Sequence, residues 1–188
     1  MRKTTPISEK RMIQGTDKSI KDFWKWGFSD LLSNSLRGIF AEFLVGTALG
    51  CLNDSRKEWD SYDLIYRGKK IEVKSAAYIQ SWFTDKYSTI NFNIGAKREY
   101  DFTKRRYSTT IKRNADVYVF CLLKEKDVEN LDPLNICHWE FYIVLTKDLD
   151  EHFPEQKTIS LASLNKLRDA FVFEEIRERM DKVLEIIS

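Results

Sequence analysis

The order of apolar and polar positions along the chain predicts several helices. The segment DKSIKDFWKWGFSDLLS, at about residues 17–33, places its aromatic residues on one side of a helix, with Asp17 as a candidate N-cap. NSLRGIFAEFLVGTALG predicts a second helix, with Asn34 or Ser35 as the N-cap and Gly50 as the C-cap. The closing part of the chain, which includes EEIRERMDKVLEII, also has a helical pattern.

The pattern between these helices is typical of strands. YDLIY and KIEVKSAAY, joined by RGKK, predict a β-hairpin, and STINFNIG alternates apolar with polar residues. ADVYVFCLL is continuously apolar, so we expect a strand buried on both faces, and WEFYIVLTK predicts another strand. The basic stretch 97–115 is interpreted as part helix and part loop. The order predicts an α/β fold, with a central mixed β-sheet flanked by helices on both faces.

Length and composition fit one globular domain. The chain has 188 residues, of which 43% are hydrophobic, enough for a sizeable core. We therefore expect a single domain over 1–188, with helical additions at about 1–33 and 160–188. The apolar runs are too short to span a bilayer, the N-terminus does not resemble a secretory signal, and three cysteines without a CxxC pair support neither disulfides nor zinc. These features predict a cytoplasmic protein that does not bind membranes.

The predicted hairpin carries three ionisable residues within apolar surroundings. Glu72 and Lys74 point to one side of their strand, because side chains alternate. A hairpin closed at RGKK pairs residue 66 with 71, give or take one, and so brings Asp63 close to Lys74. Neighbouring carboxylates repel each other unless a cation lies between them, and their oxygens, with the Val73 carbonyl, suit Mg²⁺ or Mn²⁺. The alternative is an exposed cross-strand ion pair, worth at most about 1 kcal/mol.

One further carboxylate lies on the preceding helix. Glu42 is the only charged residue between Arg37 and Asp54, and Gly38 and Gly46 lie four residues to either side of it. A buried carboxylate needs a partner, because leaving it unpaired costs several kcal/mol. The partner is either the predicted metal ion or a base, such as Arg37.

An acidic residue on a first helix, an aspartate on one strand and E-x-K on the next strand resemble the PD-(D/E)xK, or restriction-endonuclease-like, superfamily. Here they are Glu42 in RGIFAEF, Asp63 in YDLIY, and Glu72 with Lys74 in IEVKS. EVKSAAYIQSW is also similar to a group of uncharacterised bacterial proteins in that superfamily. The residue before Asp63 is Tyr62 rather than proline, and Asp60 is a rival for the role of Asp63.

The resemblance implies metal-dependent cleavage of a phosphodiester bond. In that scheme Mg²⁺, or Mn²⁺, is held by Asp63, Glu72 and the Val73 carbonyl, with Glu42 binding directly or through water. Lys74 orients or deprotonates the attacking water or stabilises the phosphate, and Gln80 hydrogen-bonds the water or a phosphate.

A basic segment offers a surface for the substrate. Between residues 97 and 113 there are seven Lys or Arg residues and two acids. The predicted nucleic-acid-binding residues are Lys97, Arg98, Lys104, Arg105, Arg106, Lys112 and Arg113. The predicted function is a metal-dependent nuclease, most readily of DNA, in a restriction-like, defence or repair role. The alternatives are a non-catalytic nucleic-acid-binding module and a structural protein with an ion-pair cluster. A homodimer is compatible with cutting both strands.

Overall fold

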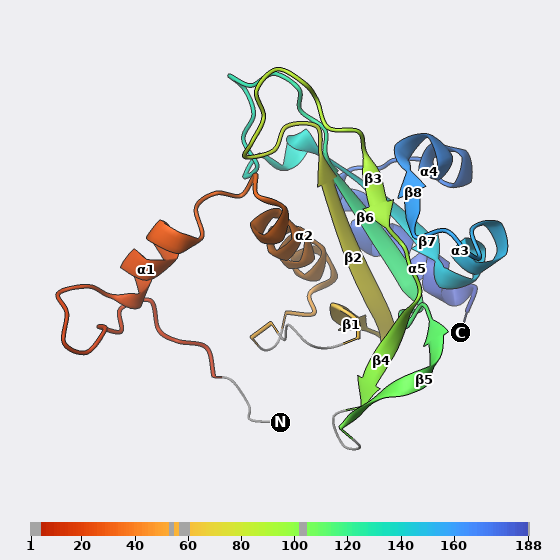
Figure 1. The fold of residues 1–188 in the computed structure, drawn as a ribbon, viewed down its shortest axis with the longest axis horizontal. Coiled ribbons are helices and arrows are strands. Elements are labelled where there is room, and N and C mark those ends of the chain that lie inside the picture. Colours follow the sequence, from red (N-terminus) through yellow and green to blue (C-terminus); the bar gives the residue numbers. More distant parts are fainter. Residues whose placement is uncertain (1–4, 53–54, 57–60, 102–104, 188) are drawn as a thin grey trace.

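A computed structural model describes residues 5–52, 55–56, 61–101 and 105–187 of the chain. Its centre is a mixed four-stranded sheet in the order β1-β2-β6-β7 (Figure 1). The strands are β1 (Leu64–Tyr66), β2 (Lys69–Ala77), β6 (Val117–Leu123) and β7 (Trp139–Leu145). β2 runs parallel to β6, and the other two neighbouring pairs are antiparallel. Every residue of β6 is buried, as its continuous apolar run predicts.

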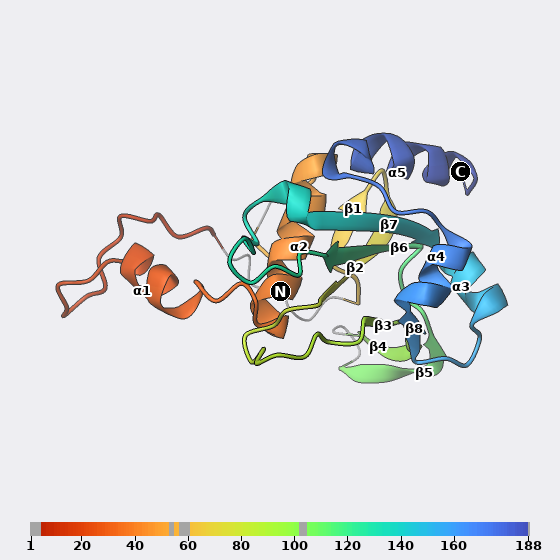
Figure 2. The same ribbon diagram turned by 90° about the horizontal axis from the view of Figure 1, so that it is seen from above.

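Two long helices cover one face of this sheet. They are α2 (Asn34–Leu49) and α5 (Ile176–Glu185), and both lie against the same side of β2, β6 and β7 (Figure 2). Ala41 and Val45 of α2 and Ile176 and Met180 of α5 are fully buried there. Val73, in the middle of β2, points into this layer.

Smaller elements cover the other face. They are β3 (Asn91–Asn93) paired with β8 (Thr158–Ser160), together with α3 (Thr146–His152) and α4 (Leu161–Leu167). Phe92, Leu149 and Leu164 fill the space between these elements and the sheet. The predicted α/β fold with helices on both faces is confirmed. Short 3-10 helices at Ile136–His138 and Phe173–Glu175 complete the described elements, and no helix in the described ranges is long and apolar enough to cross a bilayer.

The basic stretch 97–115 is not helical, so that prediction was wrong. It forms a second antiparallel hairpin, β4 (Lys97–Asp101) and β5 (Arg106–Lys112), which extends beyond the lower end of β2 in Figure 1. Tyr100 pairs with Tyr107 across the hairpin, with ring centroids 5.1 Å apart. Such aromatic pairs, and the β-branched residues of β5, favour strands over helix.

The first hairpin has a different register from the one predicted. Arg67 and Gly68 have φ values of 49° and 76° and form a two-residue turn, so Tyr66 pairs with Lys69 and Leu64 with Ile71. Residue 66 therefore does not pair with residue 71, because the turn takes two residues rather than four. The shift carries Asp63 toward Glu72 and Val73 instead of Lys74.

The predicted helix boundaries also need correction at the N-terminal side. The first helix, α1, covers only Ile20–Gly27, and its N-cap is Ser19 rather than Asp17, because Ser19 and Asp22 form a capping box. The N-cap of α2 is Ser33, whose side chain accepts a hydrogen bond from the Leu36 N–H, rather than Asn34 or Ser35. Gly50 is the C-cap, as predicted, with a φ of 68°.

Candidate active site

Asp63 lies at the outer edge of β2, immediately before the short strand β1. Its Oδ2 accepts a hydrogen bond of 2.7 Å from the backbone N–H of Val73, which lies past the end of the β1 pairing. The N–H and C=O of one strand residue point to the same neighbouring strand. The Val73 carbonyl therefore faces the same edge as the Asp63 carboxylate, as the predicted ligand set requires.

Glu72 points to the opposite side of β2 from Val73, and its side chain is only 4% exposed. Two ammonium groups contact its Oε1: the Nζ of Lys74 at 2.6 Å and the Nζ of Lys97 at 3.1 Å. Lys74 comes from the same strand, whereas Lys97 comes from the start of β4. Burying the carboxylate without such partners would cost several kcal/mol.

Glu42 belongs to α2, on the side of the sheet that carries Val73. It accepts two hydrogen bonds from the guanidinium of Arg56, at 2.5 and 2.8 Å. The partner is thus a base, as one of the two alternatives predicted, but Arg56 instead of Arg37. Arg37 is itself buried and hydrogen-bonds the Leu32 carbonyl and the Asn34 side chain.

The negative charges of Glu72 and Glu42 both act on the carboxylate of Asp63. Burial raises the pKa of Asp63 to about 6, and repulsion from Glu72 and then Glu42 adds to the effect. The Val73 N–H and the Lys74 ammonium act in the opposite direction. Asp63 thus lies between an acid on either side of the sheet edge, in surroundings that favour an added cation.

The donor types at this edge suit a hard divalent cation. Carboxylate oxygens and a backbone carbonyl are the ligands that Mg²⁺ and Mn²⁺ prefer. Among the described residues, however, no three His, Cys, Asp or Glu side chains lie close enough together to hold a metal ion. The cations of Lys74, Lys97 and Arg56 neutralise the carboxylates in this arrangement. Metal binding would therefore require the side chains to exchange these partners.

The basic hairpin contacts the carboxylate cluster at its base. Besides Lys97 on Glu72, Glu99 of β4 accepts a hydrogen bond of 2.8 Å from Ser61, two residues before Asp63. The sequence pattern predicts only substrate binding for Lys97 and does not indicate its contact with Glu72. No local pattern signals that contact, because the two residues are 25 positions apart.

One comparison with known proteins gave a match that covers most of the chain. A sequence model of the family described as Bacteriophage T4 endonuclease IV matches residues 3–163 of the 188. The chain belongs to this endonuclease family. A comparison with curated proteins gave no match. The matched region includes Glu42, Asp63, Glu72 and Lys74. The cluster therefore lies in the part of the chain that matches this family of nucleases.

The structure separates some predicted residues of this endonuclease IV family member from the cluster. Gln80 lies beyond the far end of β2, which is about 16 Å from Glu72 at the rise of a strand. Its side chain donates to Ser88 at 2.8 Å and faces Arg37 at 3.5 Å. The structure therefore gives Gln80 a structural contact and does not bring it to Asp63.

The predicted basic surface is only partly exposed. Arg98, Arg105, Arg106 and Lys112 are exposed on the hairpin, and Lys97 is half exposed. Arg113 is 6% exposed and donates hydrogen bonds to Asp150 and to the carbonyls of Ile94 and Phe153. The prediction that Arg113 contacts nucleic acid was therefore wrong. Lys104 and Asp60 lie outside the described residues.

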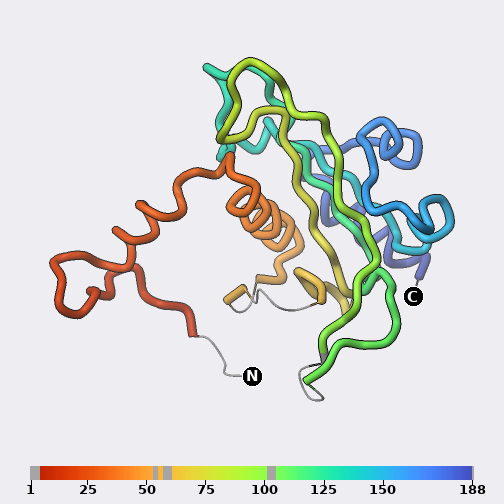
Figure 3. The backbone as a smooth tube through the Cα atoms, in the orientation of Figure 1, coloured from red at the N-terminus to blue at the C-terminus, as the bar shows by residue number. Residues whose placement is uncertain are grey.

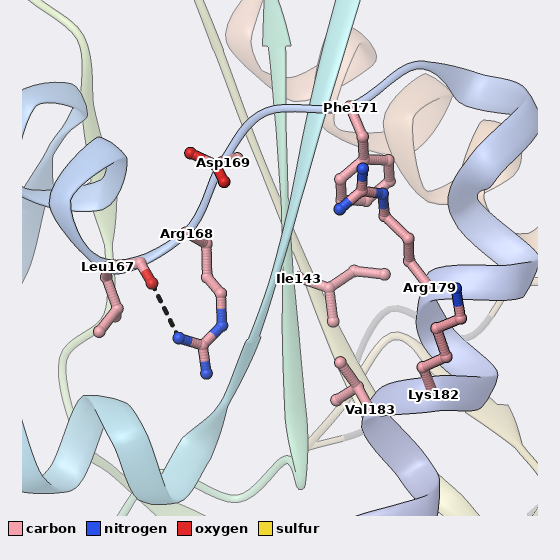
Figure 4. Close-up of a pocket in the computed structure, with 8 residues that line it drawn as sticks. All are labelled: Ile143, Leu167, Arg168, Asp169, Phe171, Arg179, Lys182 and Val183. Carbon is pink, nitrogen blue, oxygen red and sulfur yellow. Dashed lines mark hydrogen bonds between the residues drawn. The ribbon is translucent and has the colours of Figure 1, made fainter.

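A pocket of about 270 Å³ lies on the other side of the endonuclease, against β7 and α5 (Figure 4). Arg168, Arg179 and Lys182 line it, and the Arg179 guanidinium lies 4.7 Å from the centre of the Phe171 ring. Each of these cations is paired with an acid: Asp148, Glu175 and Glu178, respectively. Because these pairs cancel the positive charge, the pocket does not offer an anion site comparable to the exposed hairpin.

Proposed function

We propose that the protein is a divalent-metal-dependent nuclease of the PD-(D/E)xK type that hydrolyses phosphodiester bonds in DNA. The observation that carries this proposal is the geometry near the start of β2: Asp63 accepts a hydrogen bond from the Val73 N–H, and the buried Glu72 contacts the Nζ of Lys74 at 2.6 Å. Burial and the charges of Glu72 and Glu42 raise the pKa of Asp63 at the same place. Such a concentration of negative charge beside a lysine is typical of a catalytic site and unfavourable for stability alone. The family membership supports the nuclease activity.

Each residue of the cluster has a chemical role in this proposal. Asp63, Glu72 and the Val73 carbonyl would hold Mg²⁺ or Mn²⁺, and Glu42 would support it from α2. The bound ion supplies charge neutralisation at the scissile phosphate and a more acidic water. Lys74, released from Glu72, orients the attacking water and shields charge on the phosphate.

The β4–β5 hairpin is the proposed contact with the DNA backbone. Its exposed cations lie beyond the end of β2 to which Glu72 is closest, and Lys97 joins the two regions. Cations that neutralise phosphates supply affinity without reading sequence. The backbone of DNA bound along the hairpin would thus pass close to Glu72 and Asp63.

A cleavage assay tests the proposed function. Purified protein with Mg²⁺ is expected to cut plasmid or single-stranded DNA, and Lys74→Ala is expected to slow cleavage about 100-fold or more, since a positioned proton-transfer group contributes at least that much. Lys124→Ala is the matched control, because Lys124, directly after β6, forms a comparable Lys–Glu pair with Glu140 of β7 at 3.0 Å. Equal activity of the Lys74 variant and the wild type would contradict the proposal, as would a protein that binds DNA without cutting it.

Lys97 is expected to affect the chemical step more than its place on the hairpin suggests. Lys97→Met should lower kcat by about 10-fold or more. The variant has no ammonium group beside Glu72 to offset the negative charge on the reacting phosphate. Arg106→Met, farther along the hairpin, should instead raise KM and reduce the salt dependence of binding, with kcat unchanged. Single-turnover kinetics separates the two effects. If both variants change only KM, Lys97 is a simple DNA contact.

A further inference from the structure

The N-terminal segment forms an arm that projects from the body of the protein. The arm, here residues 7–28, contains α1, and it stands apart from the sheet and its covering helices in each view (Figures 1, 2 and 3). Within the described chain, no residue of α1 is buried. Besides Ile7 at its start, the arm leaves six large apolar side chains exposed: Met12, Ile13, Phe23, Trp24, Trp26 and Phe28, of which Trp26 is 85% exposed.

This arm has a defined local structure despite its lack of packing. Ser19 and Asp22 cap α1, Met12 bridges to Ser19, and the rings of Phe23 and Phe28 meet edge to face at 5.6 Å. A helix of eight residues is marginal in water unless a tertiary contact covers its apolar side. An ordered arm with such a surface therefore needs a partner that covers it.

A second apolar surface lies on the body of the protein. Ile39 and Phe43 are four residues apart on α2 and are exposed on the side away from the sheet. Leu52 is also exposed and lies against Gly46 of α2, where an added Cβ would come within 2.3 Å of it. These three residues, the α2 patch, face away from the core that Ala41 and Val45 enter.

We infer that the arm of one protein packs against the α2 patch of a second copy of the same chain. A two-fold axis makes both contacts equivalent, because each copy offers one arm and one patch. At roughly 150–250 Å² for a large side chain, the exposed fractions of the nine residues amount to about 800 Å² per copy. That is the area that each partner contributes to a standard stable interface, about 800 Å².

The charges on the arm favour this protein partner over a polyanion. Residues 7–28 contain five Lys or Arg residues and three Asp or Glu residues, whereas residues 97–113 contain seven and two. Binding to phosphates relies on an excess of cations, which is larger on the hairpin than on the arm. The arm and the hairpin are therefore assigned to different partners.

Sedimentation equilibrium of the full chain tests the inference. The wild-type protein is expected to have twice its monomer mass of 22.3 kDa at micromolar concentration. Trp26→Ser on the arm and Phe43→Ser on the patch should each raise the dimer dissociation constant at least 10-fold. Trp82→Ser is the matched control, because Trp82 is 59% exposed but belongs to neither surface, and it should leave the dimer intact.

Mixing the two variants tests the exchange of arms specifically. A heterodimer of Trp26→Ser with Phe43→Ser contains one fully wild-type arm–patch contact, so it should form more tightly than either variant alone. Circular dichroism of each variant confirms that it folds. A wild-type chain that stays monomeric at about 100 μM overturns the inference, and so does a dimer that tolerates both substitutions. A change in tryptophan fluorescence on addition of DNA that Trp26→Ser abolishes, in a chain that stays monomeric without DNA, would also overturn it.

Discussion

Asp63→Asn is expected to abolish nuclease activity, by about 1,000-fold or more, while it stabilises the fold. The activity falls because an amide lacks the charge that the proposed metal and phosphate chemistry needs. The stability rises because the ionised Asp63 is repelled by Glu72 and Glu42 and is poorly hydrated. At pH 7.5 we expect the free energy of unfolding of the variant to be about 1–3 kcal/mol higher than that of the wild type, because the fold raises the pKa of Asp63 from 3.8 to about 6.

The gain in stability should depend on pH in a defined direction. The pKa of Asp63 is about 6 in the folded protein and 3.8 in the reference state, so the folded chain keeps its proton where the unfolded chain has lost it. The contribution of Asp63 to stability therefore falls as pH rises through this window. Urea unfolding at pH 4.5 and pH 7.5 should show a larger difference between variant and wild type at pH 7.5.

Asp116→Asn is the matched control for this experiment. The Asp116 carboxylate also accepts a hydrogen bond from a backbone N–H of β2, that of Lys70, at 2.8 Å. Its removal should lower stability slightly and leave cleavage unchanged. If Asp63→Asn keeps its activity, or is destabilised at pH 7.5 as Asp116→Asn is, the aspartate serves only to bind the edge of β2.

Removal of divalent cations is expected to reduce cleavage to background, about 10,000-fold or more, and Mg²⁺ or Mn²⁺ should restore it. The cluster contains three carboxylates, and its own lysines and arginine leave the pKa of Asp63 raised. Added metal should also stabilise the fold, by about 3 kcal/mol at 100 times its dissociation constant. Calorimetry with Mn²⁺ and a thermal melt measure the two effects independently of activity.

Glu72→Gln should remove the Mn²⁺ signal in both measurements. Glu140→Gln is the control, because Glu140 of β7 also forms an ion pair with a lysine, Lys124, but lies away from Asp63. Full activity in the presence of a chelator would contradict the metal-dependent mechanism. A Mn²⁺ signal that survives Glu72→Gln would place the ion elsewhere in the protein.

The sequence by itself determined the fold class, the buried strand at 117–123 and the common side of Glu72 and Lys74. These properties follow from local periodicity, since alternation along a strand fixes which side chains share a face. The burial of Glu42 and its need for a partner were also readable, because it is the only charge in a long apolar stretch. Its actual partner, Arg56, was not.

Only the tertiary structure decided which distant residues meet. The Arg67–Gly68 turn set the register that carries Asp63 to Val73, and the folding of 97–112 as a hairpin brought Lys97 to Glu72. Arg113 has the same basic character as Arg106, yet it is buried because it follows the end of β5 into the core. The contacts of a charged side chain depend on the geometry of the whole fold. Local sequence determines only the face of the strand or helix from which that side chain projects.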